Sequence, residues 1–345
     1  NQSALSDFYP WMNSYDLDAH YSLNGSLQTG YHQKNYKIAT ISWEKARTWG
    51  VGIDATLFGK LTVGLDYYDR KTTGIIMDVP VPAEFGLGAY KDNVGAMVNR
   101  GVELTLNYNE SWDDWSFGVS ANLAYNKNKV LYLDGVQSLA DGDLKVKQVG
   151  AAYGTYRLYK TGGFFQSDEE AKRWQEKHKN DAGYPFKRDF KAGDLIYMDT
   201  NEDGLINADD RVLCGSSNPS YTFGLNLSAG YKSIDCSVML TGVADVKRMI
   251  DINGFGGEWS GDDCHPNNIW LDAWTPDNRD AKMPRIAVGK TSNNLEYSDF
   301  WLQDGSYLRL KNLQLGYTLP KKILKSMGVE NLRVYYSGEN LLTFH

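Results

Sequence analysis

Alternation of apolar and polar residues is the clearest regularity in this chain. It runs without interruption through residues 220–243, SYTFGLNLSAGYKSIDCSVMLTGV. Every second residue from Tyr221 to Tyr231 is apolar or aromatic, and the residues between them are small or polar. A period of two is typical of a β-strand whose two faces meet different environments. The pattern breaks at residues 232–233 and resumes at Ile234, so this segment predicts a β-hairpin.

Tyrosines bound the first strand of this predicted hairpin, Tyr221 at one end and Tyr231 at the other. Steps of about 3.4 Å per residue, tilted by about 40°, project the distance between them to about 26 Å. That height matches the apolar band of about 25 Å, flanked by aromatic belts, of a transmembrane β-barrel. A soluble β-sandwich would place the same apolar face in its core, so one hairpin leaves both architectures open.

The same plan recurs along the chain. Alternation predicts hairpins around the turn at residues 58–60 and around the break at 109–114, and a closing pair of strands after residue 307. The apolar phase slips between Leu310 and Leu313, which predicts a β-bulge at Lys311 and Asn312. Two further strands with weaker alternation are predicted over residues 21–30 and 36–41.

The predicted connections alternate between short and long, and all the long ones fall at one end of the hairpins. Residues 71–99, 126–219 and 244–306 carry no strand pattern, apart from a short helix that Ser167 is expected to cap. Outer-membrane barrels have short periplasmic turns and long extracellular loops, whereas a sandwich rarely carries such loops. We therefore predict an all-β fold, an antiparallel transmembrane β-barrel with residues 126–219 and 244–306 as extracellular loops.

Composition changes this picture little. A mean hydropathy of −0.48 and the absence of a long apolar run exclude transmembrane helices. The net charge of −7, with no basic stripe, argues against a nucleic-acid partner. No nucleophile motif accompanies any of the five histidines, and no phosphate-binding motif is present, so we predict no enzyme.

Residues 199–210, DTNEDGLINADD, have the spacing of a calcium-binding loop. The predicted ligands are Asp199, Asn201, Asp203, Leu205 through its carbonyl oxygen, Asn207 and Asp210. Gly204 would supply the sharp turn. The last ligand is Asp instead of Glu, a shorter side chain that could admit Mg²⁺ in place of Ca²⁺. We expect a structural cation, and the alternative is a surface loop rich in Asx turns.

Four tryptophans lie in the second long loop among Asp and Asn residues: Trp259, Trp270, Trp274 and Trp301. Aromatic rings beside amides and carboxylates could bind a sugar or a peptide at the barrel mouth. They could equally pack the loops against each other, and the sequence leaves both roles open.

Four segments also resemble blocks of SusC-like (RagA/SusC type) TonB-dependent transporters of Bacteroidota, in that family's order. They are SWEKARTWGVGIDATLFGKLTVGLDYYDRKT (42–72), NVGAMVNRGVELTL (93–106), GDLIYMDTNEDGLINADDRVLCGSSNPSYTFGLNLSAGY (193–231) and SYLRLKNLQLGYTLPKKILKSMGVENLRVYYSGENLLTF (306–344). The resemblance implies the C-terminal part of an outer-membrane barrel of about 22 strands. The family's N-terminal plug domain, its TonB-contacting segment and its final strands are expected to lie outside these residues.

By that resemblance, the protein would import oligosaccharides or oligopeptides across the outer membrane. It would work with a SusD-like surface lipoprotein and with TonB. The sequence does not distinguish the two substrate classes. Two alternatives remain at this stage, a passive outer-membrane porin or structural barrel and a soluble calcium-dependent glycan-binding sandwich.

Overall fold

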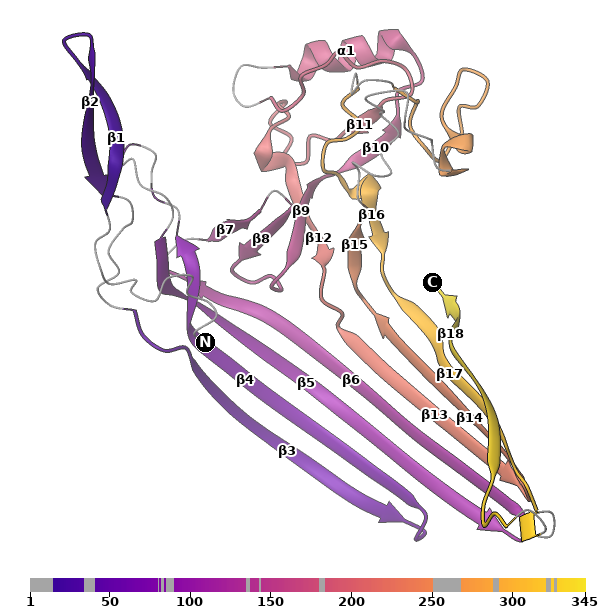
Figure 1. Cartoon of the computed structure of the whole chain (residues 1–345). Helices are drawn as coiled ribbons and strands as arrows, with labels where there is room; N and C mark the ends of the chain where they lie inside the picture. Colours follow the sequence, from indigo (N-terminus) through magenta and orange to yellow (C-terminus); the bar gives the residue numbers. More distant parts are fainter. Residues whose placement is uncertain are drawn as a thin grey trace.

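The computed structural model describes residues 15–33, 41–79, 81, 84, 90–134, 137–142, 144–179, 184–250, 268–287, 292–320, 324–325 and 328–345. A long, twisted antiparallel sheet dominates the fold, and a folded group of loop segments stands at one of its ends (Figure 1). A separate two-stranded hairpin stands beside that end. No helix in the described part of the chain is long and apolar enough to cross a membrane.

The main sheet has eight strands in the order β18-β17-β14-β13-β6-β5-β4-β3, and every neighbouring pair is antiparallel. Its strands are β3 (Lys45–Leu57), β4 (Leu61–Val79), β5 (Tyr90–Trp112), β6 (Trp115–Leu133), β13 (Tyr221–Tyr231), β14 (Ile234–Ala244), β17 (Tyr307–Thr318) and β18 (Arg333–Phe344). The predicted hairpins are confirmed as β3–β4, β5–β6 and β13–β14, and the closing pair as β17–β18.

Tight turns close the hairpins at the end of the sheet away from the loops. Phe58 and Gly59 both adopt positive φ between β3 and β4, and Asp113 and Lys232 do so in the turns after β5 and β13. Left-handed residues suit two-residue hairpin turns because their twist matches that of the flanking strands. The short connections predicted from the sequence are therefore these tight turns, at the end of the sheet away from the loops.

The register gives the sheet one apolar and one polar face. One row of cross-strand partners is Ile53, Leu65, Leu104, Leu123 and Phe223. The adjacent row, on the opposite face, is Asp54, Gly64, Thr105, Asn122 and Gly224. In this chain alone Ile53 is 65% exposed and Leu65 44% exposed. So large an unburied apolar surface requires an apolar environment outside the sheet.

Aromatic pairs mark both limits of the apolar face. Tyr221 opposes Tyr125 across β13 and β6, with ring centroids 4.8 Å apart. At the other end Tyr231 opposes Trp115, with centroids 4.4 Å apart. The predicted pair of aromatic belts is therefore built from cross-strand contacts, and the strand between them has the predicted bounds.

Strands β4, β5 and β6 continue well past the belt near the loops. The prediction of strand-free loops from residue 71 and from residue 126 was wrong, because β4 runs to Val79, β5 begins at Tyr90 and β6 runs to Leu133. Gly74 adopts a φ of 64°, and the register shifts on either side of Ile75. These irregularities interrupt the period-two alternation of apolar residues. The strand extensions could therefore not be recognised from the sequence pattern.

A small apolar core forms where these extensions meet the loops. It consists of Met77, Val94, Val130, Leu133 and Leu139, with half-buried side chains around it. The predicted bulge is confirmed, since the pairing of β17 with both neighbours skips Lys311.

The first hairpin differs from the prediction of one strand over residues 21–30, and the predicted strand over 36–41 lies almost entirely outside the described residues. The hairpin has two strands, β1 (Tyr15–Leu23) and β2 (Ser26–Gln33), joined at Asn24 and Gly25. Both turn residues have positive φ, 53° and 76°, as an Asn-Gly hairpin turn requires.

We call the described parts of residues 137–219 and 245–306 the loop assembly. Its strands are β7 (Ser138–Asp141), β8 (Lys145–Gln148), β9 (Thr155–Tyr159), β10 (Thr161–Phe164), β11 (Leu195–Tyr197), β12 (Arg211–Ser216), β15 (Lys247–Met249) and β16 (Leu302–Asp304). They form a sheet in the order β12-β9-β8-β7 and the pairs β10–β11 and β15–β16. Helix α1 (Asp168–His178) covers one side (Figure 1). Its N-cap is Ser167, as predicted, accepting a hydrogen bond from Glu170 N at 3.2 Å.

An aromatic core holds α1 against this assembly. The buried residues include Tyr159, Phe165, Phe186, Phe190 and Tyr197. Trp174, on the inner side of α1, packs 4.9 Å from the ring of Phe190, centroid to centroid. A core of this size makes the assembly a folded unit instead of a set of independent surface loops.

Candidate functional site

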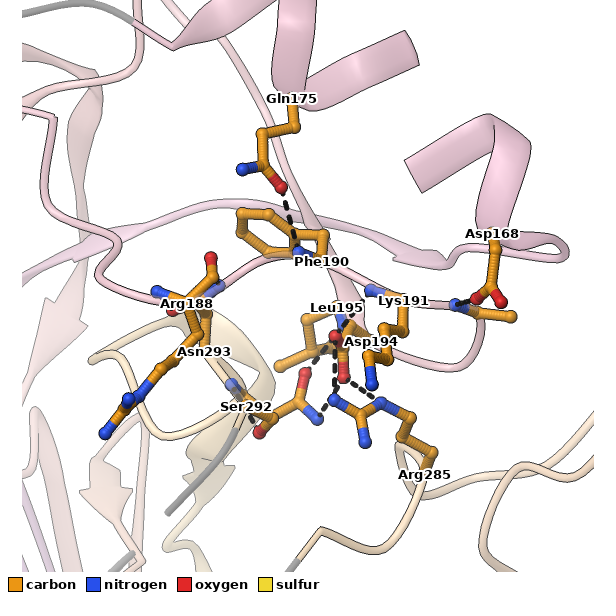
Figure 2. A network of polar contacts seen from close by, with 12 residues as sticks. Asp168, Gln175, Arg188, Phe190, Lys191, Asp194, Leu195, Arg285, Ser292 and Asn293 are labelled. Carbon is orange, nitrogen blue, oxygen red and sulfur yellow. Dashed lines mark hydrogen bonds and ion pairs between the residues drawn. The ribbon is translucent and has the colours of Figure 1, made fainter. Parts of the chain in front are cut away.

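Asp194 and Arg285 join the two long loops in the interior of the loop assembly (Figure 2). Arg285 Nε lies 2.6 Å from Asp194 Oδ1, and its Nη2 donates a hydrogen bond to Oδ2 at 3.2 Å. Asn294 Nδ2 donates to Oδ1 at 3.0 Å, and the backbone N–H of Lys191 donates to Oδ2 at 2.8 Å. The Asp194 side chain is fully buried and that of Arg285 is 18% exposed. Both oxygens of the buried carboxylate are therefore satisfied, as a buried charge requires.

Further hydrogen bonds connect the same two loops. Leu195 N donates to Asn294 Oδ1 at 2.8 Å, and the hydroxyl of Tyr197 donates to the carbonyl of Asn293 at 2.7 Å. Asn293 also exchanges two hydrogen bonds with the backbone of Arg188, at 3.1 Å and 2.8 Å. Hydrogen bonds of both backbone and side-chain groups thus hold the first long loop to the second, between residues about a hundred positions apart in the chain.

Helix α1 is tied to the segment that carries Asp194. Gln175 Oε1 accepts a hydrogen bond from Phe190 N at 2.9 Å, and Asp168 Oδ1 accepts one from Ala192 N at 2.8 Å (Figure 2). The helix, the first long loop and the second long loop therefore form one connected body.

Burial affects two acidic side chains in this body. It raises the pKa of Asp194 above that of an ordinary aspartate, and the guanidinium of Arg285 opposes the shift. It also raises the pKa of Glu296, while Arg211 and Lys187 act in the opposite direction.

The predicted cation loop, residues 199–210, lies at the edge of the assembly next to the end of α1. Asp199 Oδ2 accepts a hydrogen bond from Gly204 N at 2.8 Å. Asn201 Oδ1 accepts from Asp203 N at 3.1 Å, and Asp203 Oδ1 accepts from Leu205 N at 2.8 Å. These contacts wind the loop into a tight turn, the conformation that the spacing predicts.

Asp210 closes the loop from its far end. Its fully buried carboxylate accepts hydrogen bonds from Thr200 N at 2.8 Å and from Asn207 N at 2.9 Å. The carbonyl of Gly204 lies 3.1 Å from His178 Nδ1 at the end of α1. The first and last predicted side-chain ligands are thereby brought into one turn beside the helix.

One oxygen atom in this turn fits a cation. Asp199 Oδ1 is buried and has no hydrogen-bond partner, although the other oxygen of the same carboxylate is paired. A buried, unpaired carboxylate oxygen is costly unless something binds it. Within the described residues, no three carboxylate, imidazole or thiolate groups converge as a finished metal centre. The loop thus offers suitable ligand types and one unpaired oxygen.

Three of the four predicted tryptophans are buried. Trp270, Trp274 and Trp301 are 5%, 6% and 2% exposed. The rings of Trp270 and Trp301 lie 6.4 Å apart, and Trp301 Nε1 donates to the carbonyl of Asn294 at 2.8 Å. These positions favour the packing role for the three. Trp259 lies outside the described residues, and its contact with a ligand stays a prediction.

The sheet and the loop assembly together define a class of protein. An antiparallel sheet with one apolar face between two aromatic belts, and with a folded loop assembly beyond one belt, is the wall of a transmembrane β-barrel. A family model described as "TonB dependent receptor-like, beta-barrel" matches residues 8–244. The chain belongs to this family, which consists of barrel proteins and not enzymes, and the soluble sandwich is excluded.

Curated relatives agree with this assignment. The chain is 29% identical over 329 residues to "TonB-dependent receptor P26" of Formosa agariphila, covering 94% of this chain and 33% of that protein. It is 22% identical over 359 residues to "TonB-dependent receptor SusC" of Bacteroides thetaiotaomicron, covering 98% and 33%. The chain thus spans about a third of the length of these relatives.

Solved structures show the same fold. The RagAB peptide transporter superposes with a TM-score of 0.74 at 23% identity, covering 96% of this chain and 34% of that one. The RagAB peptide importer in its "open-open" state gives a TM-score of 0.72 at the same identity. The SusC and RagA resemblance found in the sequence is therefore confirmed for family and fold.

Proposed function

We propose that this chain forms part of the barrel of a TonB-dependent importer in the outer membrane. The single observation that carries the proposal is the two-faced sheet with a folded loop assembly at one end, in a chain of this family. An apolar outer face suits lipid, a polar inner face suits a hydrated passage, and loops at one end suit recognition outside the cell.

The transported substrate in this proposal is an oligosaccharide or an oligopeptide, taken up together with a SusD-like surface lipoprotein. Two findings support it, the similarity to a receptor named SusC and the likeness of fold to a structure described as a peptide transporter. The lipoprotein would rest on the loop assembly, whose aromatic core and buried ion pair make it rigid enough to hold a partner.

Uptake by intact cells tests the transport proposal. Cells producing the full-length protein should take up labelled oligosaccharide or oligopeptide, and cells lacking TonB should not. Uptake that continues without TonB and after collapse of the proton gradient would instead identify a passive porin. Purification of the full-length protein under mild detergent should recover a surface lipoprotein with it.

We further propose that residues 199–210 bind one divalent cation, Ca²⁺ or else Mg²⁺, for a structural purpose. The proposed ligands are Asp199, Asn201, Asp203, Leu205, Asn207 and Asp210. Three of them are carboxylates in one turn, and their mutual repulsion would fall when a cation binds. The unpaired Asp199 Oδ1 is the observation that favours this site over a simple turn.

Calorimetric titration of the purified full-length protein with calcium chloride, and separately with magnesium chloride, tests this site. Asp203→Ala should abolish binding. Asp209→Ala is the matched control, because it removes the same charge from the same loop at a position outside the predicted ligand set. Equal binding by both variants, or none by the unmodified protein, would leave the loop as an Asx-rich turn.

A further inference from the structure

Positive charge gathers on the apolar side of the sheet, just beyond the aromatic belt near the loops. On β3, β4, β5 and β6, three rows of cross-strand partners follow the belt row of Val51, Tyr67, Val102 and Tyr125 toward the loop assembly. In order, the rows are Trp49, Asp69, Arg100 and Lys127, then Arg47, Lys71, Val98 and Lys129, then Lys45, Thr73, Ala96 and Tyr132. Directly opposite residues share a face, so these rows continue the apolar face.

Six of these residues are cationic, and we call them the basic patch: Lys45, Arg47, Lys71, Arg100, Lys127 and Lys129. All six are exposed. Asp69 is the only carboxylate in the three rows, and its Oδ2 lies 2.6 Å from Arg100 Nε. In the part of the chain that the structure describes, no carboxylate forms an ion pair with the other five cations of the patch.

Lysines at the opposite end of the sheet are treated differently. In the turn after β3, Lys60 Nζ lies 2.6 Å from a carboxylate oxygen of Glu110. In the turn after β13, Lys232 Nζ lies 3.6 Å from one of Asp114. The chain neutralises these two lysines itself, whereas most of the basic patch is left for another molecule to neutralise.

The basic patch cannot be recognised as a basic stripe in the sequence, because its residues come from four strands and are spread over positions 45–129. It occurs in a chain whose net charge is −7. It is also local, since β13, β14 and β17 begin or end at the belt. A confined cluster of cations on an acidic protein indicates an anionic partner at that place.

The height of the patch indicates what kind of partner it meets. Successive rows on one face are two residues apart, which at a tilt of about 40° is about 5 Å in height. The first two rows therefore stand about 5 Å and 10 Å beyond the belt, at the level of the lipid headgroups. The four strands span about 14 Å, a width that suits a headgroup with more than one phosphate.

We propose that the basic patch binds the phosphate groups of an anionic glycolipid in the outer leaflet of the outer membrane. Its lysine and arginine side chains would donate charge-assisted hydrogen bonds to phosphate oxygens, while the apolar face below the belt packs against the acyl chains. The inference rests on the proposed orientation, with the loop assembly outside the cell. It goes beyond transport, because it assigns a lipid neighbour to one sector of the barrel wall.

Lipid binding by the purified full-length protein tests this inference. Bis-phosphorylated lipid A, dephosphorylated lipid A and phosphatidylglycerol are titrated separately in mild detergent, and bound lipid is counted by native mass spectrometry. The unmodified protein should bind the phosphorylated glycolipid most tightly, and its affinity should fall as salt rises. The triple variant Arg47→Gln, Lys71→Gln and Lys129→Gln should bind this lipid at least about tenfold more weakly.

The matched control is the triple variant Lys172→Gln, Arg173→Gln and Lys177→Gln, because it removes the same charges from exposed positions on α1. It should bind the phosphorylated glycolipid as the unmodified protein does. Heat-modifiable mobility shows that both variants are folded. Equal affinity of the two variants, or phosphatidylglycerol bound as tightly as the phosphorylated glycolipid, would overturn the inference.

A segment of the same polypeptide is the competing occupant of the basic patch. In that case the patch variant would melt at a lower temperature than the control variant in lipid-free detergent, which would also overturn the inference. Lipid binding is measured without substrate or TonB, so its failure would leave the proposed transport function standing.

Discussion

Arg285 lies 2.6 Å from Asp194 across a sequence separation of 91 residues, and this ion pair makes two long loops into one body. The carboxylate of Asp194 is fully buried, so it depends on partners inside the loop assembly. The first prediction concerns this contact.

Arg285→Ala should destabilise the loop assembly by about 3–5 kcal/mol, because it leaves the buried carboxylate of Asp194 without its counter-charge. Limited proteolysis of the full-length protein should show faster cleavage within residues 137–219, while the heat-modifiable mobility of the barrel stays unchanged. Lys172→Ala is the control, since its exposed pair with Glu176 spans 3.9 Å and its loss should not change the cleavage rate. Equal cleavage of both variants would contradict the prediction.

The second prediction concerns the two faces of β13. Leu227 lies opposite Val119 and Val238 on the apolar face, so Leu227→Arg should cost about 2–4 kcal/mol near the middle of the membrane. Asn226→Arg, one residue away on the polar face, should cost less. Denaturant titration of the full-length protein refolded into lipid vesicles measures both, and equal costs would reverse the assignment of the faces.

A third prediction fixes the orientation in the membrane. Leu271 in the loop assembly is 87% exposed, and Phe58 in the β3–β4 turn is 94% exposed. On intact cells, an impermeant thiol reagent should label Leu271→Cys and should label Phe58→Cys only after lysis. Both variants are made in a background without native cysteines. The reverse pattern would place the loops 126–219 and 244–306 in the periplasm.

The fourth prediction is a pH dependence. Because burial raises the pKa of Glu296 above its ordinary value of 4.5, the folded loop assembly binds this proton more tightly than the unfolded chain. Its stability contribution is therefore complete below pH 4.5 and is lost as the pH rises through the raised pKa. Glu296→Gln should slow proteolysis of the loop assembly at neutral pH. That advantage should disappear in acid, and an advantage that persists there would disprove the assignment.

Much of the sheet could be predicted from the sequence because a membrane imposes a period of two on every strand. Tyr221 and Tyr231 bound β13 in the structure as they do in the pattern. The extension of β4 was missed because Gly74 shifts the register and ends the alternation. The turn at Asn24 and Gly25 was missed although Asn-Gly is a strong hairpin signal, because the flanking residues alternate weakly.

The inside of the loop assembly could not be predicted in the same way. Asp194 bonds to Asn294, a hundred residues away, and neither residue stands in a periodic segment. No local rule places such partners together, since the contact depends on how two long loops fold over each other. The loop 199–210 could be proposed as a cation site because its predicted ligands are close in sequence, and calcium binding there stays a prediction.

The Tyr125–Tyr221 pair described above also marks a boundary for protein engineering. On the side of the hairpin turns, the strands follow the alternation of apolar and polar residues that is common to barrel proteins. On the other side the chain folds around contacts of its own, Asp194 with Arg285 foremost. A chimera joined at the level of this pair, and beside it at the matching positions of β14 and β17, would exchange the loop assembly whole. Under the proposed transport function the donor's specificity would travel with the graft, and the host's barrel would keep its own fit to the membrane.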